Sequence, residues 1–176
     1  MSDTTNHNLL RPGTPIPTLN LPKLGGGEIS IGGAKDRWTL FMVYRGKHCP
    51  RCKKYLNKLD EMKQAWNDIG VDIVCVSADP QEKAQADLDE FGWSFDLGYD
   101  LQVEDMRRLG LYVSTPLSEK ESDRPFAEPG TYFITPEGKT MIVAVSNGPA
   151  VRPDLDELLD GMTFNITNNR PIRGLA

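Results

Sequence analysis

The 176-residue sequence predicts an α/β sandwich in which a mixed central β-sheet carries helices on both faces. Three observations support this prediction. Residues 38–44 (WTLFMVY) form a continuous apolar run, as expected of a strand covered on both faces. A helical pattern follows this run and leads to a second one, VDIVCV at 71–76. Near the C-terminus, Pro-Glu-Gly-Lys separates two further strand-like runs, which indicates a hairpin.

Residues 1–27 contain four prolines and end in three consecutive glycines, which indicates an extended N-terminal segment and a turn. Residues 28–31 are expected to form a short edge strand. The helix predicted from Pro50 to about Asp68 has apolar residues at spacings of four, three and four, so one of its faces should be buried. These apolar residues are Tyr55, Leu59, Met62 and Trp66.

The second half of the chain continues the same domain, which we expect to span residues 28–164. The predicted elements are helices at 81–91 and 102–109, a long polar loop at 114–130, strands at 132–135 and 141–145, and a helix at 153–162. The two apolar runs joined by a helix form a parallel crossover unit, for which we expect the right-handed connection. Residues 165–176 are predicted to be a mobile C-terminal tail.

Composition excludes several classes of function. The formal charge is −5, from 20 Lys and Arg against 25 Asp and Glu, so nucleic acid is not an expected partner. The sequence shows neither a signal pattern nor an apolar run of the roughly 18 residues that a membrane helix needs, which predicts a cytoplasmic protein without a membrane partner. Three cysteines cannot all pair internally, and in a reducing compartment a Cys-x-x-Cys pair indicates catalysis or metal binding.

The stretch RGKHCPRCKK at 45–54 contains five cations, one histidine and no acid. Cys49 precedes Pro50, and proline is favoured at the first helical position, so Cys49 is the predicted N-cap. Its sulfur would face the unpaired N–H groups and the positive end of the helix dipole, which favour the thiolate. The neighbouring residues that add to this effect are Arg45, Lys47, His48 and Arg51. Thiols in such settings have pKa values of roughly 3.5–7.5, so we expect Cys49 to be largely ionised near neutral pH.

Cys52 lies almost one helical turn beyond Cys49, on the predicted apolar face, and should be less exposed. An exposed thiolate beside a sheltered thiol suits a two-step exchange. Cys49 would attack a peroxide or a disulfide, and Cys52 would resolve the intermediate to a Cys49–Cys52 disulfide. Arg51, between the cysteines, is a candidate for tuning both sulfurs, and His48 is either a proton donor or acceptor or a solvated neighbour.

Other interpretations remain open at this point. A zinc site needs about four ligands, and beyond the pair the chain offers only Cys75, His7 and His48. We therefore predict no metal and no cofactor. A further alternative is an exposed cysteine pair with no catalytic or metal-binding role. Cys75 lies inside an apolar run and is expected to be a core residue.

The segment YRGKHCPRCKKYL, which includes Gly46, resembles the R-G-x-x-C-P-x-C motif of the peroxiredoxin-like proteins in the alkyl hydroperoxide reductase and thiol-specific antioxidant family. The C-terminal stretch from Glu128 to about residue 159 is similar to the final hairpin and helix of that group. This resemblance implies a thioredoxin-like fold and an antioxidant thiol oxidoreductase. It also implies that Pro129 is a cis-proline facing the cysteine pair.

The resemblance further implies a peroxide or disulfide substrate and a thiol reductant such as a thioredoxin-type protein or glutathione. Homodimers are common in the family, although no motif here fixes an interface. Peroxiredoxins carry Pro-x-x-x-Thr-x-x-Cys, but the threonine position is occupied by Gly46 when counted from Cys49, and by Cys49 when counted from Cys52. Disulfide exchange therefore fits these residues better. The alternative function is a redox-responsive binding protein in which oxidation of the pair switches a surface without turnover.

Overall fold

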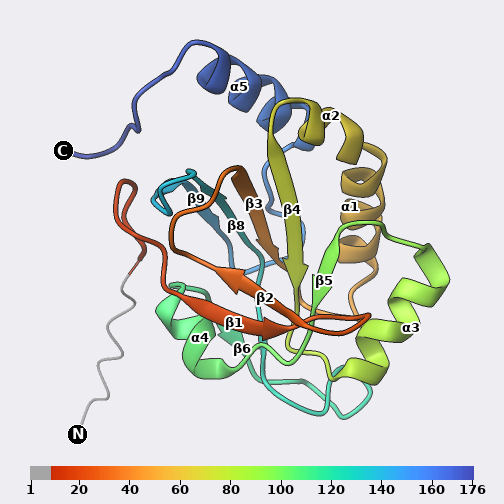
Figure 1. Cartoon of the computed structure of the whole chain (residues 1–176). Coiled ribbons are helices and arrows are strands. Elements are labelled where there is room, and N and C mark those ends of the chain that lie inside the picture. Colours follow the sequence, from red (N-terminus) through yellow and green to blue (C-terminus); the bar gives the residue numbers. More distant parts are fainter. Residues whose placement is uncertain (1–8) are drawn as a thin grey trace, which may run out of the picture.

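The computed structural model describes residues 9–176, and its core is a five-stranded mixed sheet with the order β5-β4-β3-β8-β9 (Figure 1). The strands are β3 (Trp38–Val43), β4 (Val71–Val76), β5 (Asp96–Gly98), β8 (Gly130–Ile134) and β9 (Thr140–Val145). The first three are parallel, whereas β8 pairs antiparallel with both β3 and β9. The predicted mixed sheet and thioredoxin-like α/β class are thus confirmed.

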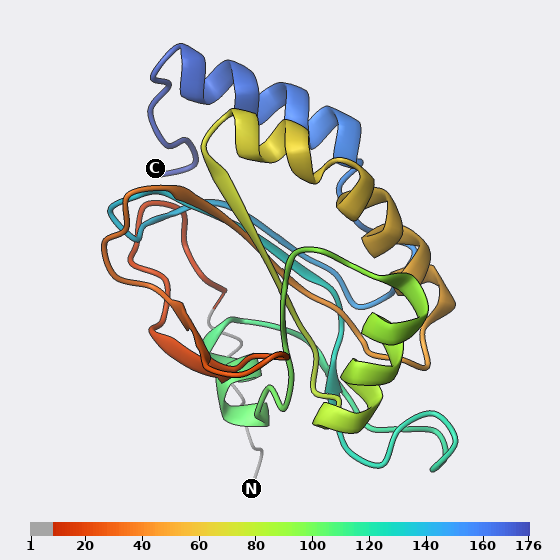
Figure 2. The ribbon, with the colours of Figure 1, turned by 45° about the vertical axis from the view of Figure 1, so that its right-hand side comes forward.

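Two layers cover the sheet (Figure 2). The helices on one face are α1 (Pro50–Glu61), α2 (Lys63–Asp68), α3 (Gln81–Phe91) and α5 (Leu155–Thr167). The other face carries the hairpin of β1 (Leu19–Pro22) and β2 (Glu28–Ile31), helix α4 (Val103–Arg108), and the short pair β6 (Val113–Ser114) and β7 (Phe126–Ala127). Strand β3 has apolar side chains on both faces. Leu40 and Met42 pack in the core under the helices α1, α2, α3 and α5, called the first core here, and Phe41 and Val43 pack in the second core, under the β1–β2 hairpin and α4.

Several elements differ from the sequence prediction. The helix expected from Pro50 to Asp68 is divided at Met62, which ends α1 and precedes α2. The predicted edge strand at 28–31 pairs with β1, a strand that lies inside the expected N-terminal segment. Strand β5 was not predicted, because three residues are too short for an alternation pattern. The last helix continues to Thr167, and Ile172 of the predicted tail packs against the first core.

The fold places the cysteine pair at the carboxyl end of β3. Residues 44–49 connect that strand to the first turn of α1. Buried residues along α1 and α2 hold the helix layer against the sheet, and Cys52 begins this buried stripe as predicted. Its members are Cys52, Leu56, Leu59 and Trp66. None of the helices within residues 9–176 is long and apolar enough to span a membrane.

Candidate active site

Cys49 caps the N-terminus of α1. Its backbone is extended (φ −104°, ψ 98°), Pro50 occupies the first helical position, and its sulfur accepts a hydrogen bond from the backbone N–H of Cys52 at 3.3 Å. The cap satisfies one of the free N–H groups in the first helical turn and favours a negative charge on the sulfur. The predicted cap geometry is therefore confirmed.

The two thiols have opposite pKa shifts. The side chain of Cys52 hydrogen-bonds to the Cys49 sulfur, and this bond contributes most to lowering the pKa of Cys49 to about 5. The N–H of Cys52 and the guanidinium of Arg45 act in the same direction, whereas burial opposes them. The hydrogen bond to Cys49, together with burial, raises the pKa of Cys52 well above its ordinary value. At neutral pH the pair is a thiolate beside a thiol.

The expectation that Cys49 is the more exposed thiol is wrong, because both side chains are only 1% exposed. The segment from Glu121 to Glu128 packs against the residues that precede Cys49. Arg45 forms ion pairs with Glu128 (3.1 Å) and Glu121 (3.4 Å), and its guanidinium lies 4.9 Å from the centre of the Phe126 ring. This long-range packing shelters a sulfur that local sequence placed at the surface.

Arg152 is the functional candidate that the sequence prediction missed. Its Nη2 donates to the Sγ of Cys52 at 2.6 Å, and its Nη1 donates to the carbonyl oxygen of Pro149 at 2.9 Å. The guanidinium also lies 5.0 Å from the centre of the Tyr55 ring. Arg152 forms no ion pair with a carboxylate in the described part of the chain. No spacing signal links it to Cys52, because 100 residues separate them.

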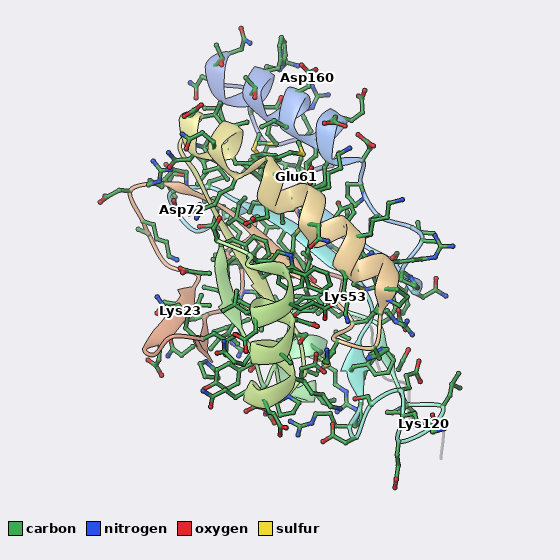
Figure 3. All side chains as sticks on the ribbon, turned by 90° about the vertical axis from the view of Figure 1, so that its right-hand side faces the viewer. Lys23, Lys53, Glu61, Asp72, Lys120 and Asp160 are labelled. Atoms are coloured by element: carbon green, nitrogen blue, oxygen red, sulfur yellow. The ribbon has the colours of Figure 1, made fainter. Side chains whose placement is uncertain are left out.

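The other cations of the 45–54 stretch act differently from what we expected. Lys47 and Lys53 form ion pairs with the buried Asp87 of α3, at 3.5 Å and 3.4 Å, and Lys53 lies on the side of α1 that faces α3 (Figure 3). Arg51 is exposed and lines a cavity beside α1. The cations that lower the pKa of Cys49 are Arg45 and Arg152 instead, and both contribute less than the hydrogen bonds from Cys52.

His48 packs its ring against Phe126, with the ring centres 4.6 Å apart. Both ring nitrogens are buried and have no hydrogen-bond partner among residues 9–176. Burial, and then the charge of Arg45, lower the pKa of His48. The lowered pKa favours the neutral imidazole, and the burial of its two nitrogens differs from the solvated neighbour that was one of the two expectations.

Gly46 is required by its surroundings. Its φ is +126°, and a Cβ atom there would lie 2.7 Å from the Oδ2 of Asp79. The same carboxylate oxygen accepts the N–H of Lys47 at 2.7 Å, so Asp79 fixes the loop that leads to Cys49. Gly46 thus supports the site through backbone geometry.

The prediction that Pro129 is a cis-proline is wrong, because residues 9–176 contain no cis peptide bond and Pro129 is trans. Hydrogen bonds hold this segment extended, since the N–H of Glu128 donates to the carbonyl of Tyr112 and the carbonyl of Pro129 accepts from Ser146. Pro129 lines a cavity of about 150 Å³ that Arg152 also borders.

Cys75 is fully buried in the first core, and burial raises its pKa, as expected of a structural thiol. Within the described residues, no group of three or more His, Cys, Asp or Glu side chains is placed to hold a metal ion. His7, which the zinc alternative would need, lies outside the described residues.

Comparison with known proteins identifies the family. The AhpC/TSA family model matches residues 12–142, which is well over half of the chain. The chain belongs to the AhpC/TSA family. A Mycobacterium tuberculosis protein provisionally named a peroxiredoxin is 24% identical over 142 residues, covering 81% of this chain and 87% of that protein. The thiol-disulfide oxidoreductase ResA of Halalkalibacterium halodurans is 23% identical over 156 residues, covering 88% and 79%.

Solved structures support the fold of this AhpC/TSA family member. A peroxiredoxin-like protein from Aquifex aeolicus superposes with a TM-score of 0.75 at 20% identity, covering 90% of this chain and 88% of that one. Family membership and the thiolate-thiol pair together make the chain a thiol-dependent oxidoreductase. The alternative of a binding protein that is oxidised without turnover is not favoured.

Proposed function

We propose that this AhpC/TSA enzyme reduces hydroperoxides, with Cys49 as the attacking thiolate and Cys52 as the resolving thiol. The observation that carries the proposal is the hydrogen bond between the two thiols, which leaves Cys49 ionised and Cys52 protonated. The thiolate is the nucleophile in both peroxide reduction and disulfide exchange, so this arrangement supports Cys49 as the sulfur that reacts first.

The first step transfers one oxygen atom. The Cys49 thiolate attacks the terminal oxygen of ROOH, the O–O bond breaks, and the products are Cys49 sulfenic acid and an alkoxide that takes up a proton as ROH. In the second step Cys52 loses its proton and attacks the Cys49 sulfur. A Cys49–Cys52 disulfide forms, and the sulfenic oxygen leaves as water. Arg152, which donates to the Cys52 sulfur, is placed to stabilise the thiolate that this step requires.

Burial of the attacking sulfur favours a small oxidant. Both oxidants must align the bond that breaks with the Cys49 sulfur, but a protein disulfide must also bring its own chain up to a residue that is 1% exposed, whereas a hydroperoxide is small. Disulfide exchange remains the second candidate, because the peroxiredoxin threonine position is Gly46 and because ResA is among the relatives. In that reaction Cys49 would form a mixed disulfide and Cys52 would release it.

The regenerating partner is proposed to be a thiol reductant, either a thioredoxin-type protein or a small thiol such as glutathione. Such a reductant fits the cytoplasm, the compartment that three unpaired cysteines also favour. We propose an antioxidant role there, in a monomer or a homodimer.

Oxidation of cysteine variants by hydrogen peroxide tests the proposal. The wild-type protein should form a Cys49–Cys52 disulfide, Cys52→Ser should stop at Cys49 sulfenic acid, and Cys49→Ser should not consume peroxide at a significant rate. Cys75→Ser is the matched control and should behave as wild type, because its thiol is buried in the core. Catalytic turnover with dithiothreitol distinguishes the enzyme from a redox-responsive binding protein. Consumption that stopped after one equivalent of peroxide would contradict the proposal.

A further inference from the structure

A cavity of about 320 Å³ lies between helix α1 and the segment that leads into α5. Its size is at the lower end of pockets that hold small ligands. The apolar part of the wall is formed by Tyr55, Pro149, Pro153 and Leu155. The cationic side chains come from α1 and from Arg152. The lining residues from α1 are Arg51, Lys54, Tyr55 and Lys58, and the opposite wall is formed by residues 149, 150 and 152–155.

This cavity is cationic in a chain whose formal charge is −5. Lys58 is paired with Asp156, but Arg51 and Lys54 form no ion pair in the described structure. Asp154 is the only acid among the lining residues that the structure describes, and it is engaged as the N-cap of α5, where it accepts the N–H groups of residues 156 and 157 at 3.0 Å. The cavity therefore offers unpaired positive charge to an anionic ligand.

The cavity adjoins Cys52 and not Cys49. A small space of about 10 Å³ beside the Cys52 sulfur shares two of its walls with the larger cavity, and these are the side chains of Tyr55 and Arg152. Arg152 donates to the Cys52 sulfur and packs over the Tyr55 ring. These two side chains separate a ligand in the cavity from the resolving sulfur.

We propose that the cavity binds a small thiol that carries carboxylates, and that this thiol reduces the Cys49–Cys52 disulfide by attacking Cys52. This inference rests on the proposed function, because it requires that disulfide as the oxidised form. Glutathione is the probe with this chemistry, since it combines a thiol with two carboxylates.

The chemistry of the leaving sulfur supports attack on Cys52. A reductant thiolate bonds to the Cys52 sulfur, the S–S bond breaks, and Cys49 leaves with the electron pair. Cys49 is the better leaving group, because the N–H of Cys52 and the Arg45 guanidinium stabilise its thiolate. A second reductant thiol then attacks the mixed disulfide and releases Cys52 as a thiol and the reductant as its own disulfide. The two reductant thiols are oxidised as the enzyme disulfide is reduced.

Arg152 links binding of an anionic ligand in the cavity to exposure of the Cys52 sulfur. The Arg152 guanidinium donates to the Cys52 sulfur, which carries no charge either as a thiol or in a disulfide and is therefore a weaker acceptor than a carboxylate. A carboxylate in the cavity therefore competes for Arg152 and draws it away from the wall that covers Cys52. Oxidation also removes the negative charge of the Cys49 thiolate, with which Arg152 interacts in the reduced enzyme, so the oxidised enzyme should bind the anionic thiol more tightly than the reduced enzyme.

Steady-state reduction of the enzyme by different thiols tests the charge requirement. The double variant Arg51→Met/Lys54→Met should raise the KM for glutathione about tenfold, as expected for two exposed charge contacts, and leave reduction by neutral 2-mercaptoethanol nearly unchanged. Both residues are exposed, so the variant should fold. The matched control Arg107→Met/Lys120→Met removes the same charge from exposed positions elsewhere, and Lys120 lies on a loop far from the α1–α5 layer (Figure 3). An equal change in both double variants would overturn the proposal.

The site of attack is tested by trapping the mixed disulfide. Oxidised enzyme is mixed with glutathione, quenched with acid, alkylated and cleaved after Arg51, which separates the two cysteines. Glutathione should be found on Cys52, and glutathione found on Cys49 would overturn the inference. If no Cys49–Cys52 disulfide forms before glutathione is added, the proposed function fails instead. If the double variant raises the KM for an anionic hydroperoxide and not for glutathione, the cavity is a substrate site and the inference is wrong.

Discussion

Cys49 and Cys52 each have an arginine nearby, and the two arginines differ in how their charges are balanced. Arg45 lowers the pKa of Cys49 while its own charge is balanced by Glu128 and Glu121. Arg152 touches Cys52 directly and has no carboxylate partner within the described chain. Cys49 therefore owes its ionisation mainly to hydrogen bonds from Cys52, whereas Cys52 has an unbalanced cation beside it although it stays protonated.

This difference suits the order of the two steps. Cys49 must be a thiolate before the oxidant arrives, and short-range donors achieve this without attracting other anions. Cys52 must stay protonated until the sulfenic acid has formed, because its S–H holds the charge on Cys49. Once Cys49 is oxidised that hydrogen bond loses its anionic acceptor, and Arg152 can then stabilise the second thiolate.

The largest expected effect is that of Arg152→Met on the second step. Loss of the guanidinium at 2.6 Å should slow disulfide formation from the sulfenic acid by roughly 100-fold, the lower end of the range expected when one charge-stabilising donor is removed. Oxidation of Cys49 should change by less than about threefold, since Arg152 is a minor contributor to the pKa of Cys49. Rapid-quench mass spectrometry separates the two rates.

The control for this prediction is Arg51→Met. It removes an exposed arginine that lines the same cavity and is adjacent to Cys52 in sequence, so both steps should proceed at nearly the wild-type rate. If Arg152→Met slowed both steps equally, Arg45 and Arg152 would not act on separate steps.

Arg45→Met should change the pH dependence of the first step. The Cys49 thiolate is lost as pH falls through the folded-state pKa of about 5, so the rate of peroxide reaction should fall below that pH. Without Arg45 the pKa rises, and the inflection should move to higher pH. The second-order rate constant with hydrogen peroxide, measured between pH 4 and 9, locates this inflection.

Stability must be followed in the same variant. Arg45→Met leaves the buried Glu128 without its ion-pair partner, which should lower the free energy of unfolding by about 3 kcal/mol. Arg45→Lys keeps a charge at this position and should preserve more of both properties. An unchanged inflection in Arg45→Met would show that the helix cap and Cys52 alone set the pKa of Cys49.

The local part of this site could be predicted from the sequence. Proline after Cys49 fixes the start of α1, and the apolar spacing places Cys52 on the buried face, so the sequence signal and the structural cause lie within one helical turn. The same applies to the buried strands β3 and β4, whose continuous apolar runs need no partner to be recognised.

The long-range part could not be predicted in this way. Arg152 reaches Cys52 across 100 residues, and the segment that shelters Cys49 lies in a stretch that looked like an irregular loop. Lys47 and Lys53 look like tuning charges in sequence, but the crossover brings α3 beside them and Asp87 pairs with both. Local pattern gave the position of the sulfurs, whereas tertiary packing decided which cations reach them.

Gly46→Ala tests the loop that positions Cys49. The added Cβ would clash with the Asp79 carboxylate and would occupy a φ of +126°, so we expect a loss of about 2–3 kcal/mol in the free energy of unfolding. Gly33→Ala is the matched control, because its φ is +74° and nothing lies within 4 Å of the added atom. It should cost only about 1 kcal/mol. Chemical denaturation measures both, and equal losses would exclude a role for the Asp79 contact.

The smallest effect is expected for His48→Phe, which distinguishes packing from proton transfer beside Cys49. The neutral ring of His48 packs on Phe126, and its two buried nitrogens have no partner, so a phenyl ring keeps the contact and removes two unsatisfied polar atoms. The peroxide rate at neutral pH should stay within about twofold, with stability equal or slightly higher. His48→Ala, which loses the ring contact, should be less stable. A large loss of rate in His48→Phe with unchanged stability would mean that His48 donates a proton to the departing oxygen, and the environment of Cys49 would then include an acid that the structure leaves unpartnered until the peroxide binds.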